Sequence, residues 1–274
     1  MYKKIFFIII LISFQAHTQG WTPSGARSLS LSNASIGIED VWAYHNNPGA
    51  LAFNKGFHFG YSYENRFLLK ELQNQSFASS ISVKNGAISL GGQFFGSSLY
   101  RNNRVGVGYS LKFANKLAVG VQINYQNLRI NQYLNKGTFT GEVGILAKIN
   151  SKINFGIAVF NLNQATLSSY QDDRFSTFIR SGFTYVISPK VMVLLEAEKE
   201  LSTPIKPKMA LEYQLIDRFF LRIGASANPL SLSFGMGYGL KMGLQIDFGS
   251  SYHQTLGWSP HVGILFNPIN KNKE

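Results

Sequence analysis

The 274-residue sequence contains no cysteine. That absence excludes a disulfide framework, a lipid-acceptor cysteine, cysteine-based zinc sites and thiol catalysis, so non-covalent contacts must hold the fold together. Proline is sparse, with 8 residues, and charged residues make up only 15% of the chain, against about 25% in average soluble domains. Long apolar runs are also missing, because no segment approaches the roughly 18 consecutive apolar residues that a transmembrane helix needs. The chain is therefore neither a disulfide-stapled domain nor a bundle of membrane-spanning helices.

Acidic residues are few, with 14 against 26 lysines and arginines, which gives a formal net charge of +12. A basic balance of this size can indicate a nucleic-acid partner, but the sequence has no cluster of Lys and Arg and no recognition-helix pattern. We therefore expect no nucleic-acid partner. What the chain has in abundance is phenylalanine, tyrosine and glycine, with 22, 13 and 26 residues. This combination fits a protein whose apolar residues face lipid while small and polar residues face inward.

The first twenty residues predict export. Lys3 and Lys4 precede an apolar run over residues 5–14, and small and polar residues follow at 16–20. This order is typical of a signal peptide, and the apolar run is too short to span a bilayer as a helix. We expect residues 1–20 to be removed and the remaining chain to leave the cytoplasm.

Alternation of apolar and small residues is the strongest structural signal. Between residues 230 and 238 the even positions are all apolar and the odd positions are serine or glycine. Residues 105–113, 117–126 and 244–249 repeat the pattern, mainly with Gly, Ser, Asn and Gln between the apolar positions. In a soluble sandwich the second face would be charged and solvated, whereas a face of this kind suits a crowded barrel lumen. The prediction is an all-β fold, a transmembrane antiparallel β-barrel.

About 14 such segments occur between residues 56 and 266. Most have the roughly 9–11 residues of a tilted membrane strand, and an even strand number fits the rule for single-chain bacterial barrels. A polar tail, residues 267–274, follows the last segment. The predicted strands are 56–66, 73–83, 87–95, 104–113, 117–130, 138–149, 153–160, 175–187, 191–200, 206–215, 219–226, 230–238, 244–250 and 256–266.

Connections of two kinds alternate along the predicted barrel. Short turns rich in Asn, Gly, Pro, Asp and Ser occur at 84–86, 114–116, 150–152, 188–190 and 216–218, and longer connections at 96–103, 131–137, 161–174 and 251–255. Outer-membrane barrels alternate short periplasmic turns and longer extracellular loops in this way. We therefore expect the protein in the bacterial outer membrane, with Asn85 and Pro189 on the periplasmic side and Lys136, Ser169 and Gln254 outside.

Residues 21–55, between the signal peptide and the first strand, form a small-residue stretch followed by an Asn-Pro element. The order of motif residues is Ala26-Arg27, Asn33-Ala34, Asp40 and Asn46-Asn47-Pro48-Gly49. This order resembles the N-terminal region of FadL-like outer-membrane proteins, and within them the PorV/PorQ type of Bacteroidetes. Residues 173–182 are similar to a long-loop and strand junction of the same barrels. One departure is Asn-Pro-Gly in place of the more usual Asn-Pro-Ala.

The resemblance implies that residues 21–55 fold into the barrel as a plug. The motif residues of this plug would be Arg27, Asp40, Asn46, Asn47, Pro48 and Gly49. It further implies transport of hydrophobic small molecules or a role related to type IX secretion, with outer-membrane lipid, a hydrophobic small molecule or secretion-system proteins as partners. Two alternatives stay open. A plugged, non-conducting barrel would serve as a structural or partner-binding platform, and a soluble β-sandwich would lack the heat-modifiable migration of a barrel.

An outer-membrane hydrolase would need a nucleophile and a base on neighbouring strands. The candidates are Ser259 and His261, with Asp247, all expected to point inward, but nothing in the sequence fixes their mutual geometry. We interpret them as polar residues of the lumen and assign no catalytic residue. The other histidines lack metal-ligand spacing, so we expect no metal and no cofactor.

Inward-facing charges form a second group of candidate residues. The expected lumen network consists of Glu198, Lys208, Glu212, Arg222, Asp247 and His261. If residues 201–205 are a hairpin loop, Glu200 lies opposite Lys206 and Glu198 opposite Lys208. Ladders of this kind usually brace a barrel interior, and a path for polar solutes is the alternative.

Overall fold

The computed structural model describes residues 23–166, 174–201 and 203–267. The predicted signal peptide, the first two residues of the predicted plug, the loop around Ser169 and all but the first residue of the polar tail lie outside the described residues. Within them, fourteen strands form one closed sheet in which every strand pairs antiparallel with its sequence neighbours, and the first strand pairs with the last. The predicted all-β fold, the barrel and the strand number are confirmed.

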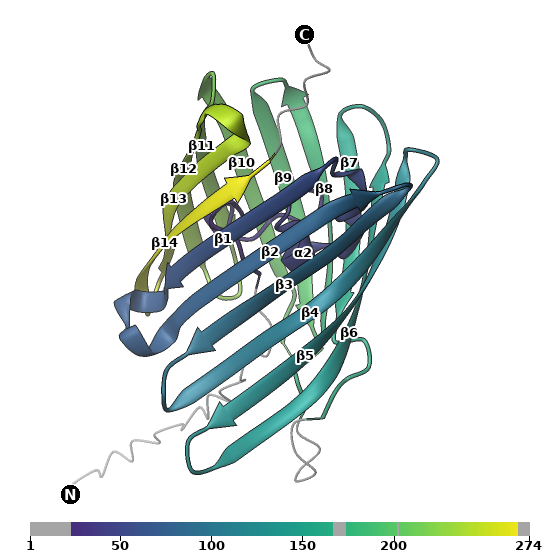
Figure 1. Ribbon diagram of the computed structural model, residues 1–274. Helices are drawn as coiled ribbons and strands as arrows, with labels where there is room; N and C mark the ends of the chain where they lie inside the picture. Colours follow the sequence, from purple (N-terminus) through teal and green to yellow (C-terminus); the bar gives the residue numbers. More distant parts are fainter. Residues whose placement is uncertain (1–22, 167–173, 202, 268–274) are drawn as a thin grey trace, which may run out of the picture.

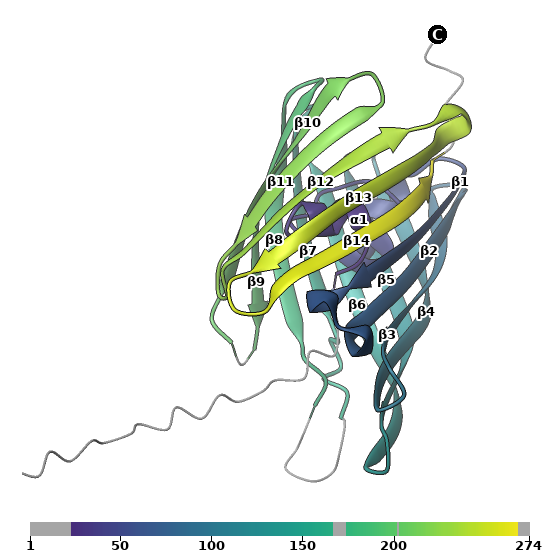
Figure 2. The ribbon, with the colours of Figure 1, turned by 90° about the vertical axis from the view of Figure 1, so that its left-hand side faces the viewer.

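The strands are tilted across the barrel wall, and the chain passes through them in sequence order (Figures 1 and 2). Short 3-10 turns η2 (Arg66–Leu68) and η3 (Lys70–Leu72) connect β1 to β2, and η4 (Lys241–Gly243) connects β12 to β13. The strands are β1 (Phe57–Asn65), β2 (Gln73–Val83), β3 (Gly86–Gly96), β4 (Tyr100–Phe113), β5 (Leu117–Ile130), β6 (Leu134–Lys148), β7 (Ile153–Phe160), β8 (Phe178–Ser188), β9 (Val191–Glu200), β10 (Lys206–Ile216), β11 (Phe219–Ser226), β12 (Ser231–Gly239), β13 (Leu244–His253) and β14 (Gly257–Phe266).

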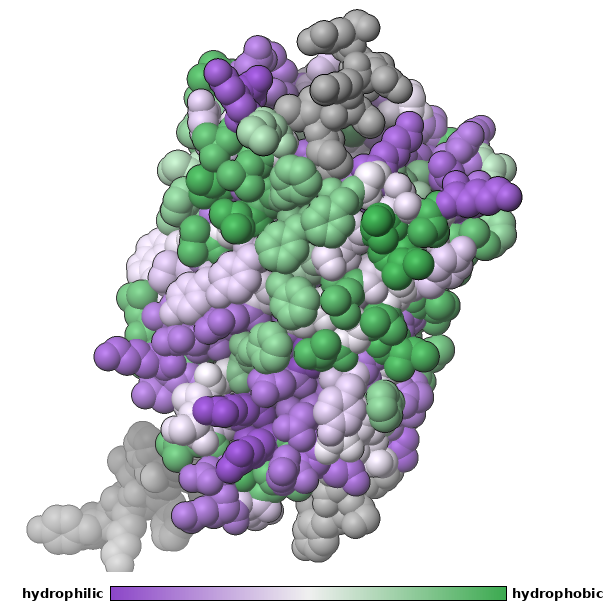
Figure 3. Space-filling model, viewed as in Figure 1, coloured by the Kyte–Doolittle hydropathy of each residue, from purple (hydrophilic) through white to green (hydrophobic). Residues whose placement is uncertain are grey.

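Most apolar side chains of the strands point outward. On β12, Phe234 and Met236 are each 48% exposed, whereas Ser233 between the apolar positions is only 5% exposed. Figure 3 shows hydrophobic residues gathered across the upper part of the visible face, with hydrophilic residues over its lower part and again at the upper rim. A closed sheet that exposes its large apolar side chains and buries its small polar ones suits a lipid environment.

The strands extend further at one end than the sequence predicted. β4 begins at Tyr100 and β6 at Leu134, rather than at residues 104 and 138, and both pair there with the end of β5. The added residues include the exposed Arg101 and Lys136. Polar residues occupy both faces of the strands here, so the alternation stops although the backbone ladder continues. The connections at 97–99 and 131–133 are therefore short, and the predicted alternation of long and short connections is only partly correct.

The chain before β1 lies inside the barrel (Figures 1 and 2). It contains α1 (Ala26–Ser30), α2 (Ala43–Asn46) and η1 (Pro48–Phe53), and nearly all of its side chains are buried. α1 contacts the wall at β1 and β11–β14, and η1 contacts it at β3–β6. We call residues 23–55 the lumen segment. No helix in the described part of the chain is long and apolar enough to cross a bilayer.

Apolar packing supports the middle of the lumen segment. Val41, Trp42, Tyr44 and Leu51 are fully or almost fully buried and form one cluster with wall residues such as Leu146. The wall contributes two alanines, Ala78 and Ala87, and two leucines to this cluster. The segment is thus packed as the core of the barrel.

Candidate functional site

The Asn-Pro-Gly element of the lumen segment rests directly on the backbone of the barrel wall. A Cβ on Gly49 would lie 2.6 Å from the carbonyl oxygen of Gly144 on β6. A Cβ on Gly120 of β5 would collide with the backbone of Pro48, and Ser110 donates a hydrogen bond of 2.7 Å to the Pro48 carbonyl. Glycine on both sides of the contact allows this approach. The approach also accounts for glycine in place of alanine after Asn-Pro.

The side chains of two asparagines in the segment form hydrogen bonds with backbone groups at its turns. Asn47 donates through Nδ2 to the carbonyls of Ile36 at 2.8 Å and Ile145 at 3.0 Å, and its Oδ1 accepts from the Gly49 amide. Asn46 donates to Ser28 Oγ and to the Trp42 carbonyl, both at 2.9 Å. An amide side chain suits these contacts because its NH₂ group offers two donors beside an acceptor oxygen.

An ion-pair cluster ties α1 to three strands. Arg27 donates to Glu212 of β10 from Nε at 2.9 Å and from Nη2 at 2.5 Å, and to Asp40 from Nη1 at 3.1 Å. Arg222 of β11 bridges Glu212 and Asp247 of β13, at 2.6 Å each. Burial lowers the pKa of Arg27, but the Glu212 and Asp40 carboxylates outweigh burial and raise it, so the guanidinium stays charged. We call these five residues the Arg27 cluster.

A second set, the Arg180 cluster, holds the backbone of the segment between its helices. It consists of Arg180 on β8, Glu196 and Glu198 on β9, and Lys208 on β10. Glu196 accepts from the amides of Ser35 at 2.9 Å and Ile36 at 3.0 Å, while Arg180 donates to the Asn33 carbonyl at 2.6 Å. The cluster therefore binds both donors and acceptors of one turn of the segment.

The third set, the Arg104 cluster, engages α2. Arg104 of β4 donates to Glu142 of β6 at 2.7 Å and contacts His45 Nδ1 at 3.1 Å, while His45 Nε2 lies 3.1 Å from the Phe77 carbonyl. A guanidinium only donates and a carbonyl only accepts, so Nδ1 must be bare and Nε2 must carry the proton. Burial, and then the charge of Arg104, lowers the pKa of His45 to about 3. His45 is therefore neutral at pH 7.

The structure places all twelve predicted site residues in the lumen and divides them among different contacts. Of the expected network, Glu212, Arg222 and Asp247 join the Arg27 cluster, and Glu198 and Lys208 join the Arg180 cluster. The strand register differs by two residues from the prediction, since Lys206 pairs with Glu198 and Lys208 with Glu196. The hairpin is asymmetric, so counting outward from its centre gave the wrong register, although the Lys208 and Glu198 side chains still form an ion pair at 2.7 Å.

The candidate hydrolase residues do not form a catalytic arrangement. His261 Nε2 lies 2.9 Å from Ser30 Oγ, Ser259 Oγ accepts from the Phe67 amide at 3.0 Å, and Asp247 is bound to Arg222. Each group thus has a separate structural partner. Among the residues that the structure describes, no three His, Cys, Asp or Glu side chains are grouped to hold a metal ion.

Sequence reasoning missed the Arg104–Glu142 pair. Both residues occupy inward positions, because Val105 and Val143 beside them face outward or partly outward. The available signal was a charged residue, arginine or glutamate, at a strand position that the alternation assigns to the lumen face. Its buried partner on the segment, His45, could not be found from strand parity, because it lies on a short helix.

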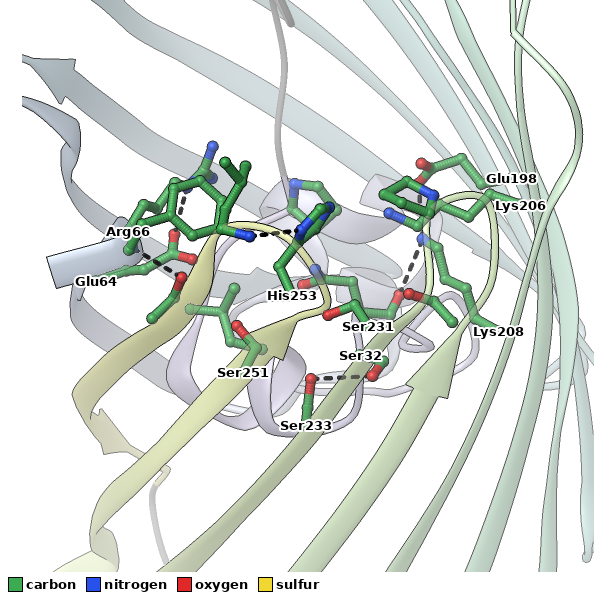
Figure 4. A pocket seen from close by; sticks show the side chains of 18 of the residues that line it. Ser32, Glu64, Arg66, Glu198, Lys206, Lys208, Ser231, Ser233, Ser251 and His253 are labelled. Carbon is green, nitrogen blue, oxygen red and sulfur yellow. Dashed lines mark hydrogen bonds and ion pairs between the residues drawn. The ribbon is translucent and has the colours of Figure 1, made fainter. Parts of the chain in front are cut away.

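Cavities lie on opposite sides of the lumen segment. The larger, about 340 Å³, lies at the end of the barrel that carries η2 and contains both apolar side chains, such as Phe178 and Leu256, and polar ones. Figure 4 shows Arg66 and Glu64 on one side of it and Glu198, Lys206 and Lys208 on another. The smaller cavity, about 160 Å³, is lined by Arg27, Glu212 and residues of the β8–β9 turn.

No protein-family model matches this chain, and no curated protein does. Solved structures do. The toluene transporter TbuX of Ralstonia pickettii matches with a TM-score of 0.65 and 13% identity, over 90% of this chain and 98% of that one. The toluene transporter TodX of Pseudomonas putida matches with a TM-score of 0.65 and 11% identity, over 90% and 98%. A FadL homologue of Pseudomonas aeruginosa matches with a TM-score of 0.63 and 10% identity, over 89% and 96%.

At this level of identity the matches show the fold. The barrel is FadL-like in architecture, as the sequence resemblance implied, and the narrower PorV/PorQ assignment stays a prediction.

Proposed function

We propose that this protein is a barrel of the bacterial outer membrane through which small hydrophobic molecules pass, with the lumen segment as its gate. One observation carries the proposal: a closed barrel with an apolar outer face holds a segment fixed in its lumen by three ion-pair clusters, with a cavity on either side of that segment. The likeness of the fold to toluene transporters supports a hydrophobic cargo.

The larger cavity is our proposed entry site. Its volume of about 340 Å³ falls in the range of roughly 300–1,000 Å³ usual for small-molecule sites. Leu29, Phe67, Phe178 and Leu256 offer apolar contacts in it. Because the lumen segment separates it from the smaller cavity, a molecule would cross only when the segment moves.

Uptake by intact cells tests the cargo. Cells that express the protein should accumulate radiolabelled toluene faster than cells with an empty vector, while sucrose uptake stays unchanged. Leu256→Lys puts a charge at the cavity and should slow toluene uptake, whereas Leu99→Lys, outside the cavity lining, should not; the two leucines are 54% and 63% exposed. Equal toluene uptake with and without the protein, at matched surface expression, would refute the proposal.

Conductance tests the gate. The intact protein should be nearly silent in planar bilayers, and deletion of residues 23–50 should open a measurable pore, because the closed sheet consists of the fourteen strands and these residues fill its lumen. A parent that conducts as strongly as the deletion would rule out the segment as a gate.

A second candidate is a non-conducting platform for partner proteins, which includes a role related to type IX secretion. The observation in its favour is the number of buried ion pairs on different sides of the segment, which suits a fixed part better than a moving one. A stoichiometric protein partner copurified from native outer membranes, together with no effect on toluene uptake, would favour the platform.

A further inference from the structure

The tight turns at one end of the barrel carry a ring of positive charge. Each of the six turns between β2 and β3, β4 and β5, β6 and β7, β8 and β9, β10 and β11, and β12 and β13 carries one lysine or arginine, and Lys55 precedes β1 at the same end. We call this set the basic collar: Lys55, Lys84, Lys116, Lys152, Lys190, Arg218 and Lys241. All seven are exposed, and none forms an ion pair with an acidic residue that the structure describes.

The opposite end of the barrel lacks such a ring. In the described parts of its connections, charged residues occur only in the link between β1 and β2 and at Arg174. The collar turns contain one acidic residue, Asp217. At the opposite end, exposed cations such as Arg101, Arg129 and Lys136 lie on the strands instead, so the ring of one cation in every turn is particular to the tight-turn end.

Every collar cation has an exposed apolar neighbour along the chain. Phe57 follows Lys55, Ile149 precedes Lys152 and Met242 follows Lys241, with 51%, 57% and 82% exposure. The exposed residues Ile81, Phe113, Ile187 and Ile216 precede Lys84, Lys116, Lys190 and Arg218 in the same way. An apolar side chain beside a long cationic one is the arrangement that lets a cation reach from the hydrocarbon boundary to the headgroups. The hydrophilic upper rim above the hydrophobic part of Figure 3 shows the same layering.

We propose that the basic collar binds the phosphate groups of anionic phospholipids around the tight-turn end of the barrel. The inference rests on the membrane insertion in our proposed function, but on neither the cargo nor the gate. A protein partner would contact one sector of the rim, whereas the collar has a cation in every turn around the circumference. A lipid annulus is the anionic partner that matches this distribution.

Boundary-lipid selectivity tests the proposal. In vesicles of phosphatidylcholine, the association of spin-labelled phosphatidylglycerol relative to spin-labelled phosphatidylcholine is measured by electron paramagnetic resonance. Two variants lower the formal net charge equally: K84Q/K116Q/K152Q/K190Q in the collar, and K70Q/R101Q/R129Q/K136Q, all exposed, at the other end. We expect the wild type and the second variant to prefer phosphatidylglycerol several-fold and the collar variant to lose most of that preference.

A wild type without preference, or equal losses in both variants, would overturn the proposal. Heat-modifiable migration verifies that each variant is folded. If the collar variant does not fold, the pair variants K84Q/K116Q and K152Q/K190Q give the same comparison with half the charge removed. Failure of toluene uptake would leave lipid selectivity intact, so the two proposals fail independently.

Discussion

Replacing Arg27 by alanine is the sharpest perturbation of the lumen segment. The guanidinium is the only described group that joins α1 to both Glu212 and Asp40. After the replacement Glu212 keeps Arg222 as a partner, at 2.6 Å. Asp40 keeps only the Trp42 amide, at 2.8 Å, and is only 3% exposed. The main effect is thus a buried carboxylate without a cation, in the segment itself.

The expected magnitude follows from this geometry. Removing one partner of a buried ion pair destabilises by about 3–5 kcal/mol. Arg27 keeps 19% of its side-chain surface exposed, so we expect the lower limit, about 3 kcal/mol. A difference of that size raises the population of undocked segment by roughly 100-fold.

Single-channel recordings and urea unfolding measure the two consequences. Openings of Arg27→Ala should be about 100 times as frequent as those of the wild type, and the unfolding midpoint should fall. Arg129→Ala, an exposed arginine on β5, is the matched control and should change neither. If Arg27→Ala behaves like Arg129→Ala in both assays, the ion pairs do not hold the segment and the reasoning fails.

Three further outcomes are expected. Phe234→Arg should block assembly, since an arginine facing mid-bilayer lipid costs about 2–4 kcal/mol, while Ser233→Arg should be milder; the reverse order of folding yields would contradict the outward face of Phe234. On intact cells, a cysteine that replaces Asn85 should not react with membrane-impermeant maleimide, and a cysteine that replaces Gln254 should react. Labelling at position 85 alone would show that the predicted topology is the wrong way round. The folded-state pKa of His45 lies near 3, so the contribution of His45 to stability is complete above about pH 6.5 and is lost as the pH falls toward 3. Replacing His45 by glutamine should reduce the pH slope of the unfolding free energy in this range by up to about 1.4 kcal/mol per pH unit. An unchanged slope would argue against a buried neutral ring.

The barrel was predictable because lipid imposes a rule on every strand. A wall residue that faces hydrocarbon must be apolar, and its neighbours face the lumen, so period two is visible in the sequence. The rule ends where the lipid ends, which is why the starts of β4 and β6 were missed. The alternation also does not show whether a hairpin loop is asymmetric, so the predicted register of Lys206 and Lys208 against β9 was wrong by two residues.

The contacts of the lumen segment were only partly predictable. Parity identified Glu212, Arg222 and Asp247 as inward, but not that Arg27 meets them, because the depth of the segment in the barrel is set by three-dimensional packing. The helices of the segment are four and five residues long, too short to display a helical period. Asp40 and Asn47 stood out only through resemblance to a known plug. Gly49 shows why the local motif departs from that pattern, since the wall backbone leaves no room for a methyl group.

The lumen segment contacts both strands of the seam that closes the barrel, β1 and β14. The seam joins the first and last strands through six residue pairs, from Phe59–Phe266 to Glu64–His261, whereas β4 and β5 share fourteen. Bringing together strands so distant in sequence carries the largest loop-closure entropy of any pairing in the barrel. Trp42 packs against Gly60 on β1, and Ser30 contacts His261 on β14. Because the segment touches both edges, we expect it to hold them near each other during assembly and so to help the last strand find the first.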